Sequence, residues 1–296
     1  MLKYTLIKAL NLVSFISKHE EEIENLKIKV FEINHEDATH VQKLQNLLID
    51  KVKSMKIHQN ILEENHFPPG FDEEFIKNFR DSAKSIITPE EHSIPWFDVR
   101  RSRLTEFMSQ IYLEKEIGCV FFDKCDKKIN LEAFEVDNHA KGIDVVGIKD
   151  HNNDFKFVVC EVKVSNDIKI PCKTSKDLKE DILKSKDNSR RVLKEVITLL
   201  QCLTTGKTSD ELNSVLKLLL ELVNAKDSKE ILYKNIVFMP FLIKRNENIV
   251  KDNNVDDLKQ FMDIKDICIE GFLWSFNDDI DTFVKNAYNI ALEEIA

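Results

Sequence analysis

The segment between residues 142 and 164 constrains the fold more than any other part of this 296-residue chain. Two apolar stretches, Gly142–Ile148 and Phe155–Val164, are rich in valine, isoleucine and phenylalanine, which favour β-strands. A polar run from Lys149 to Asp154 separates them, and its asparagine and aspartate residues suit a turn. The pattern therefore predicts a pair of antiparallel strands joined by a tight turn.

The second strand of this pair is expected to have two different faces, because side chains alternate along a strand. One face is wholly apolar and should be buried; it carries Val158, Cys160, Val162 and Val164. The other face is apolar at first and then charged at Glu161 and Lys163. Acid-x-Lys tripeptides occur eight times in the sequence, so the tripeptide itself says little. A charged pair on a strand with a buried apolar face is costly without a role, and this context selects Glu161-Val162-Lys163.

The register of the strand pair brings a second acid to the same place. If the turn is centred between Asn152 and Asn153, Asp144 lies directly opposite Glu161, with Lys163 beside them. Two carboxylates placed in this way repel each other and destabilise the sheet. A divalent cation bound by their oxygen atoms would remove that repulsion. The sequence therefore predicts a metal site at this end of the strand pair.

Glu106 is a further candidate and precedes the strand pair on a helix predicted at residues 98–116. The apolar positions of that helix form one stripe, which consists of Leu104, Phe107, Met108 and Ile111. Glu106 lies at the edge of this stripe, from where its carboxylate can join the two acids of the strand pair. The alternative interpretation is a helix glutamate that faces solvent.

Arginine is used sparingly and in clusters, with seven arginines among the 43 basic residues. Five of the seven flank the strand pair in sequence: Arg100, Arg101, Arg103, Arg190 and Arg191. Arginine binds phosphate through two hydrogen bonds at once, so these clusters are candidate contacts for nucleic acid. Between residues 163 and 194, ten basic residues outnumber five acidic ones, although the whole chain has a net charge of −9. The alternative is that these side chains form ordinary solvated helix faces.

The helix with Glu106, the strand opened by Gly142-Ile143-Asp144 and the strand closed by Glu161-Val162-Lys163 together resemble the PD-(D/E)xK nuclease superfamily. The resemblance covers about residues 98–245, with Ile143 at the position of the superfamily's proline. It implies an α/β protein with a restriction-endonuclease-like mixed sheet flanked by helices.

The resemblance also implies roles for these residues. The ligands of a Mg²⁺ or Mn²⁺ ion would be Asp144, Glu161, the Val162 carbonyl and Glu106. Lys163 would be the catalytic lysine, and the catalytic set would consist of Glu106, Asp144, Glu161 and Lys163.

The activity implied by the resemblance is that of a Mg²⁺-dependent endonuclease, which hydrolyses the phosphodiester bonds of DNA, with RNA as an open alternative. Within the superfamily, the layout is similar to that of restriction and anti-phage defence nucleases, including the nuclease subunit of Hachiman-type systems. An ATP-dependent helicase or translocase partner would supply any movement along DNA, because Gly206-Lys207-Thr208 lacks the rest of a P-loop. The alternative function is a non-catalytic nuclease-like scaffold that binds nucleic acid or a partner protein.

Breaker residues divide the chain into two predicted parts. Residues 1–95 are expected to form a mainly helical accessory region that faces a partner, with one possible strand at Leu26–Ile33. Residues 96–296 are expected to form the nuclease-like domain, with helices at 98–116, 187–203 and 279–294, another starting near 208, and further strands at 118–122, 232–243 and 267–274. No apolar run is long enough for a membrane span, and the six cysteines lack zinc-ligand spacing, which favours a cytoplasmic protein.

Overall fold

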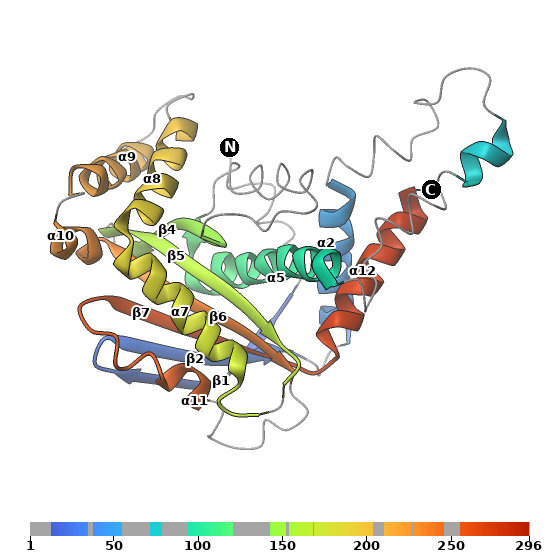
Figure 1. Cartoon of the computed structure of the whole chain (residues 1–296), viewed down its shortest axis with the longest axis horizontal. Helices are drawn as coiled ribbons and strands as arrows, with labels where there is room; N and C mark the ends of the chain where they lie inside the picture. The colour runs from blue at the N-terminus through green and yellow to red at the C-terminus, as the bar shows by residue number, and fades with distance from the viewer. Residues whose placement is uncertain are drawn as a thin grey trace.

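The computed structural model describes residues 13–34, 38–54, 72–78, 94–120, 143–151, 154–167, 169–203, 210–225, 228–245 and 255–295. The described strands form one mixed sheet in the order β1-β2-β7-β6-β5-β4-β3 (Figure 1). They are β1 (Phe15–Ile23), β2 (Leu26–Ile33), β3 (Cys119–Val120), β4 (Val145–His151), β5 (Asp154–Ser165), β6 (Ile236–Arg245) and β7 (Cys268–Phe276). The helices are α2 (Thr39–Ser54), a short one at 73–78, α5 (Ile94–Ile117), α7 (Lys173–Asp187), α8 (Ser189–Leu203), α9 (Asp210–Asn224), α10 (Lys229–Lys234), α11 (Asp256–Lys259) and α12 (Ile280–Ile295).

The predicted strand pair is confirmed as β4 and β5, which are antiparallel. Val145 pairs with Cys160 and His151 pairs with Asp154, so the turn is centred where the sequence predicts it. On the other side of β5, the strand β6 runs parallel to it. Parallel neighbours need a long crossover segment, and α7, α8, α9 and α10 lie in that crossover.

A hydrophobic core lies on each face of the sheet. Helices α2, α5 and α12 cover one face, where Cys160 and Val162 of β5 are buried. Helices α7, α8 and α9 cover the other face, against Val159 of β5. The predicted apolar face of β5 is thus confirmed as buried. The face that carries Glu161 and Lys163 lies under α7, which runs across β5 and β6 in Figure 1.

The prediction of a mainly helical N-terminal region is wrong. Residues 15–33 form two antiparallel strands, of which the sequence predicts only the second, β2. Strand β2 pairs in parallel with β7 and therefore extends the same sheet. Phe31 of β2 stacks on Tyr112 of α5, with 3.5 Å between the ring centroids. Residues from both sides of the predicted boundary at residue 95 therefore share one core.

Two further differences concern the crossover between β5 and β6. The sequence predicts no helix at residues 173–187, where α7 lies. The apolar run at 232–243 is divided between the end of α10 and β6, instead of forming a single strand. The other predicted helices and strands of residues 96–296 are found near their expected bounds. None of the helices in the described part of the chain has the length and apolar character of a membrane span.

Candidate active site

The two acids of the strand pair lie opposite each other, as the register requires. Asp144 directly precedes β4, one step before the pair of Val145 and Cys160, and Glu161 follows Cys160 on β5. The Val162 backbone N–H donates a hydrogen bond of 2.8 Å to Asp144 Oδ2. This contact fixes the Asp144 carboxylate against the strand that carries Glu161.

Glu161 is buried and Asp144 is partly buried, and desolvation is the largest influence on the pKa of both carboxyl groups. The Glu161 side chain is 1% exposed. Burial and, to a smaller extent, the Asp144 charge raise the pKa of Glu161 to about 8, although the Arg191 charge lowers it. Burial also raises the pKa of Asp144, against the lowering effect of the Val162 N–H. Desolvation and a neighbouring like charge both disfavour the ionised forms, and a bound cation would favour them.

Lys163 is held on the same face of the sheet by an acid from α7. Its Nζ lies 2.7 Å from Asp181 Oδ2, and Lys184 Nζ donates to Asp181 Oδ1 at 2.8 Å. Burial lowers the pKa of Lys163, but the hydrogen bond to Asp181 and the Asp144 charge outweigh it, so the pKa lies above its ordinary value. Burial raises the pKa of Asp181, but the bonds from Lys163 and Lys184 bring it below its ordinary value. Lys163 is therefore a fixed positive charge beside the two carboxylates.

Glu161 is also bound by residues from the end of α7 and the start of α8. Ser185 Oγ donates a hydrogen bond of 3.0 Å to Glu161 Oε1. Arg191 Nη2 lies 3.0 Å from the same oxygen, and Arg191 Nη1 donates to Ser185 Oγ at 2.9 Å. The three side chains form a closed ring of contacts, which we call the Glu161 ring. Arg191, predicted as a nucleic-acid contact, thus lies against a candidate metal ligand.

Each carboxylate keeps one oxygen outside these contacts. Among the described residues, neither Asp144 Oδ1 nor Glu161 Oε2 takes part in a hydrogen bond or an ion pair. Hard cations such as Mg²⁺ and Mn²⁺ prefer oxygen ligands, so the charge and the oxygen donors of this pair fit the implied metal.

Glu106 is not brought to this pair. It lies on α5, which covers the opposite face of the sheet, and it is buried rather than exposed to solvent. Burial is the main cause of the raised pKa of the Cys160 thiol, and the charges of Asp144, Glu161 and Glu106 add to it. In the part of the chain that the structure describes, no three histidine, cysteine, aspartate or glutamate side chains come together as a metal-binding group. The donor set in the structure is therefore the pair of Asp144 and Glu161.

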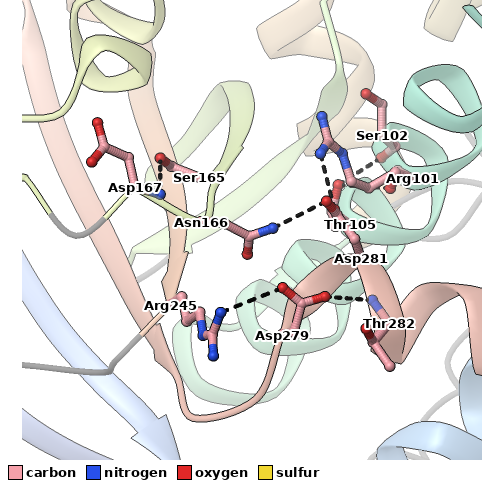
Figure 2. Close-up of polar contacts among 10 residues, drawn as sticks. All are labelled: Arg101, Ser102, Thr105, Ser165, Asn166, Asp167, Arg245, Asp279, Asp281 and Thr282. Carbon is pink, nitrogen blue, oxygen red and sulfur yellow. Dashed lines mark hydrogen bonds and ion pairs between the residues drawn. The ribbon is translucent and has the colours of Figure 1, made fainter. Parts of the chain in front are cut away.

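Arg101, another predicted nucleic-acid contact, belongs to a separate polar cluster at the start of α12 (Figure 2). Arg101 Nη1 lies 2.9 Å from Asp281 Oδ1, and Asn166 Nδ2 donates to Asp281 Oδ2 at 3.0 Å. Arg245 Nη1 lies 3.7 Å from Asp279 Oδ2. Each of these two arginines has a carboxylate partner on or just before α12. The cluster connects α5 and the ends of β5 and β6 to that helix.

The remaining predicted nucleic-acid contacts lie in different surroundings. Arg103 is buried on α5, and Arg190 is exposed at the start of α8. The Arg100 side chain lies outside the described residues. Exposed lysines accompany Arg190 along α7 and α8; they are Lys173, Lys176, Lys184 and Lys194.

An open hollow of about 780 Å³ adjoins the Glu161 ring where α7 meets α8. Its lining residues are Glu180, Asp181, Leu183, Lys184, Asp187, Asn188 and Arg191. Two of its lining residues, Asp181 and Arg191, contact Lys163 and Glu161, so the hollow lies beside the candidate site.

Asp181 and Ser185 are the residues of this site that sequence reasoning missed. Both lie on α7, which the sequence does not predict. A signal was present, because the buried residues of α7 are Ser175, Leu178, Ile182 and Ser185, at helical spacing. Two of the four are serines, so apolar periodicity alone does not find the stripe.

The fold and the site define an α/β protein in which a pair of acids, one of them fully buried, and a lysine gather at one end of a strand pair. The family model of HamA matches residues 11–291, and the chain therefore belongs to the HamA family, the Hachiman defence-associated proteins. This family has a role in Hachiman anti-phage defence, in a system with a helicase partner, HamB. Neither the curated proteins nor the solved structures yield a match to the chain.

Proposed function

We propose that this chain is the nuclease of its Hachiman system and hydrolyses phosphodiester bonds of DNA with the help of a divalent cation. The observation that carries the proposal is the gathering of Asp144, Glu161 and Lys163 around the end of β5. The order of a helix, an antiparallel strand pair and a parallel strand beyond a helical crossover agrees with a restriction-endonuclease-like fold.

Two carboxylates and one backbone group would hold the cation. They are Asp144, Glu161 and the Val162 carbonyl, with Mg²⁺ or Mn²⁺ as the ion. Such an ion supplies charge neutralisation at the phosphate and a lowered pKa for the attacking water. The set leaves out Glu106, because that residue lies on α5 against the opposite face.

Lys163 supplies the fixed positive charge of the site. Asp181 holds its ammonium group in place, so its position is set before substrate binds. A preorganised charge of this kind stabilises the negative charge that develops on the phosphate, and it orients the attacking water. The partner Asp181 comes from a different element, and α7 therefore contributes to catalysis by positioning.

The DNA backbone would approach along α7 and α8. Exposed cations lie along these helices, and Lys184 among them lines the hollow beside the site. Phosphate contacts of this kind give affinity without sequence preference. The HamB helicase would supply movement along DNA or strand separation, and this chain would supply the cut.

A cleavage assay tests this proposal. The full chain, alone and with its helicase partner, is incubated with plasmid, single-stranded DNA and RNA in Mg²⁺, Mn²⁺ or EDTA. We expect metal-dependent cleavage of DNA that falls at least about 100-fold in both Asp144→Ala and Lys163→Ala. The first removes a ligand of the cation, and the second removes the positive charge that faces the reacting phosphate. Lys265→Ala, at an exposed lysine paired with Glu24, is the control and should cleave normally. Binding of DNA without cleavage under every condition would support the non-catalytic scaffold instead.

A further inference from the structure

Arg191 contacts three groups within the described part of the chain, and these contacts distinguish it from the exposed cations around it. Besides Glu161 Oε1 and Ser185 Oγ, it donates through Nη1 to the Asp181 carbonyl at 3.4 Å. Its neighbour Arg190 is exposed at the surface of α8. Arg191 is thus attached to the end of α7 and to the sheet at the same time.

The hydrogen-bond direction in the Glu161 ring is fixed by chemistry. A guanidinium group only donates, so Ser185 Oγ accepts from Arg191 Nη1. The single hydroxyl hydrogen of Ser185 is then free to point at Glu161 Oε1, which is the contact seen. Oε1 therefore receives two donors from two elements, and the Glu161 carboxylate cannot rotate without losing both.

A role for Arg191 as a phosphate contact would be costly. Turning its guanidinium toward DNA would leave the Glu161 carboxylate, which is 1% exposed, without its charged partner. With a cation bound, as the proposed function requires, Glu161 would be ionised, and a buried charge that loses its partner destabilises a protein strongly. The geometry therefore keeps Arg191 on Glu161 while substrate is bound.

The same division of oxygens occurs at Asp144, where the Val162 N–H binds Oδ2 and the described residues leave Oδ1 without a partner. In metal sites, the ligating carboxylates are themselves hydrogen bonded by surrounding groups that orient them. We propose that Arg191 and Ser185 are positioning residues for the metal: they fix Glu161 through Oε1 and so leave Oε2 for a cation shared with Asp144. This inference rests on the proposed metal-dependent function.

Direct measurement of Mn²⁺ binding by calorimetry, without nucleic acid, tests the inference. Arg191→Lys keeps the charge but cannot contact Ser185 and Glu161 together, and Ser185→Ala removes only the hydroxyl. We expect both variants to bind Mn²⁺ about 10- to 100-fold more weakly than the natural chain. Arg190→Lys makes the same change at the adjacent exposed arginine and should leave the Mn²⁺ affinity unchanged. Thermal unfolding of each variant verifies that it is folded.

The outcomes separate the inference from the function on which it rests. If the natural chain binds Mn²⁺, Asp144→Ala abolishes binding and both ring variants bind normally, the inference is overturned and the metal site stands. Tighter binding in Arg191→Ala with normal binding in Arg191→Lys would also overturn it, by showing that Arg191 is a competing cation. If the natural chain does not bind Mn²⁺, both the metal site and the inference fail.

A DNA-binding measurement in EDTA gives a second readout. As a positioning residue, Arg191 makes no phosphate contact, so Arg191→Lys and Arg191→Gln should leave the affinity for DNA and its salt dependence unchanged. A phosphate contact would be lost in Arg191→Gln, and the slope of log affinity against log salt would fall by about one. That result would overturn the inference.

Discussion

Two groups of charged side chains lie on the same face of the sheet. They differ in how many of their carboxylate oxygens have a hydrogen-bond or ion-pair partner in the protein. The first is the ion pair of Lys244 on β6 and Asp257 on α11, whose side chains are 2% and 0% exposed. Lys244 Nζ donates to Asp257 Oδ2 at 2.7 Å and to the Lys169 carbonyl at 2.6 Å. Asp257 Oδ1 accepts from the Cys172 N–H at 2.7 Å. Both oxygens of Asp257 are therefore in use.

The second group consists of Asp144 and Glu161, and only some of its carboxylate oxygens are bound by described residues. Each carboxylate has one oxygen bound by the chain and one oxygen without a partner among the described residues. Perturbed pKa values in a cluster of charged groups are common at functional sites. The difference supports a structural role for the pair of Lys244 and Asp257, and a binding role for the pair of Asp144 and Glu161.

The largest expected effect on the free energy of unfolding comes from breaking the ion pair of Lys244 and Asp257. Lys244→Met leaves the Asp257 carboxylate buried without its counter-charge, and we expect a loss of about 3–5 kcal/mol in the free energy of unfolding. Denaturant unfolding monitored by circular dichroism measures it. Lys244→Met combined with Asp257→Asn should recover much of the loss, because Asn is uncharged and still accepts from the Cys172 N–H. A loss below about 1 kcal/mol in the single variant would contradict the structural role.

A smaller effect on stability, which depends on pH, is expected from replacing Glu161 in the pair of Asp144 and Glu161. Because the pKa of Glu161 is raised to about 8 in the folded chain, the folded state binds this proton more tightly than the unfolded state. The contribution of Glu161 to stability is therefore fully present below about pH 4.5 and is lost as the pH rises through about 8. Glu161→Gln removes this dependence, so its stability should fall less than that of the natural chain between pH 5 and pH 8. Unfolding midpoints measured in EDTA test this.

The control for that experiment is Glu22→Gln, at an exposed glutamate on β1. It should preserve the pH dependence of the natural chain. Equal pH dependence in Glu161→Gln and the natural chain would show that Glu161 titrates as an exposed acid does, and the contrast between the two groups would weaken.

The smallest effect is expected at the outer edge of the site. Lys184 is 64% exposed and shares Asp181 with Lys163. Exposed ion pairs contribute little, so Lys184→Ala should change the free energy of unfolding by less than about 0.5 kcal/mol. Denaturant unfolding of this variant beside Lys163→Ala checks it. A loss greater than about 1 kcal/mol would mean that Lys184, rather than Lys163, holds Asp181 in place.

Local pattern was enough to predict the central strand pair, because the polar residues between the two apolar stretches indicate where the chain reverses, and the observed register agrees. It failed at β1, whose residues 17–22 are mostly charged or polar and lack the apolar alternation that predicts a strand. β1 is an edge strand with one partner, so few of its side chains need to be apolar. The apolar run at 232–243 was predicted as one strand, but it contains the end of α10 and most of β6. A buried helix end and a buried strand are both continuously apolar, so hydrophobicity alone does not separate them.

The residues of the candidate site also fall into two groups, those that local sequence pattern predicts and those that it does not. Asp144, Glu161 and Lys163 follow from the strand pair alone, because alternation and register place them together. Asp181, Ser185 and Arg191 follow from no local pattern, and Glu106 was expected at the site but lies on the other face.

By itself, therefore, the sequence determined the strand pair, its register and which face of β5 carries the charged residues. The tertiary structure decided which partners those charges have, and it placed Glu106 on α5, which covers the other face of the sheet. The physical reason is the range of the interactions. Turn chemistry and strand alternation act over a few residues, whereas the contacts of Glu161 and Lys163 depend on where the crossover between β5 and β6 places α7 and α8. That placement is set by packing of the two cores against the whole sheet.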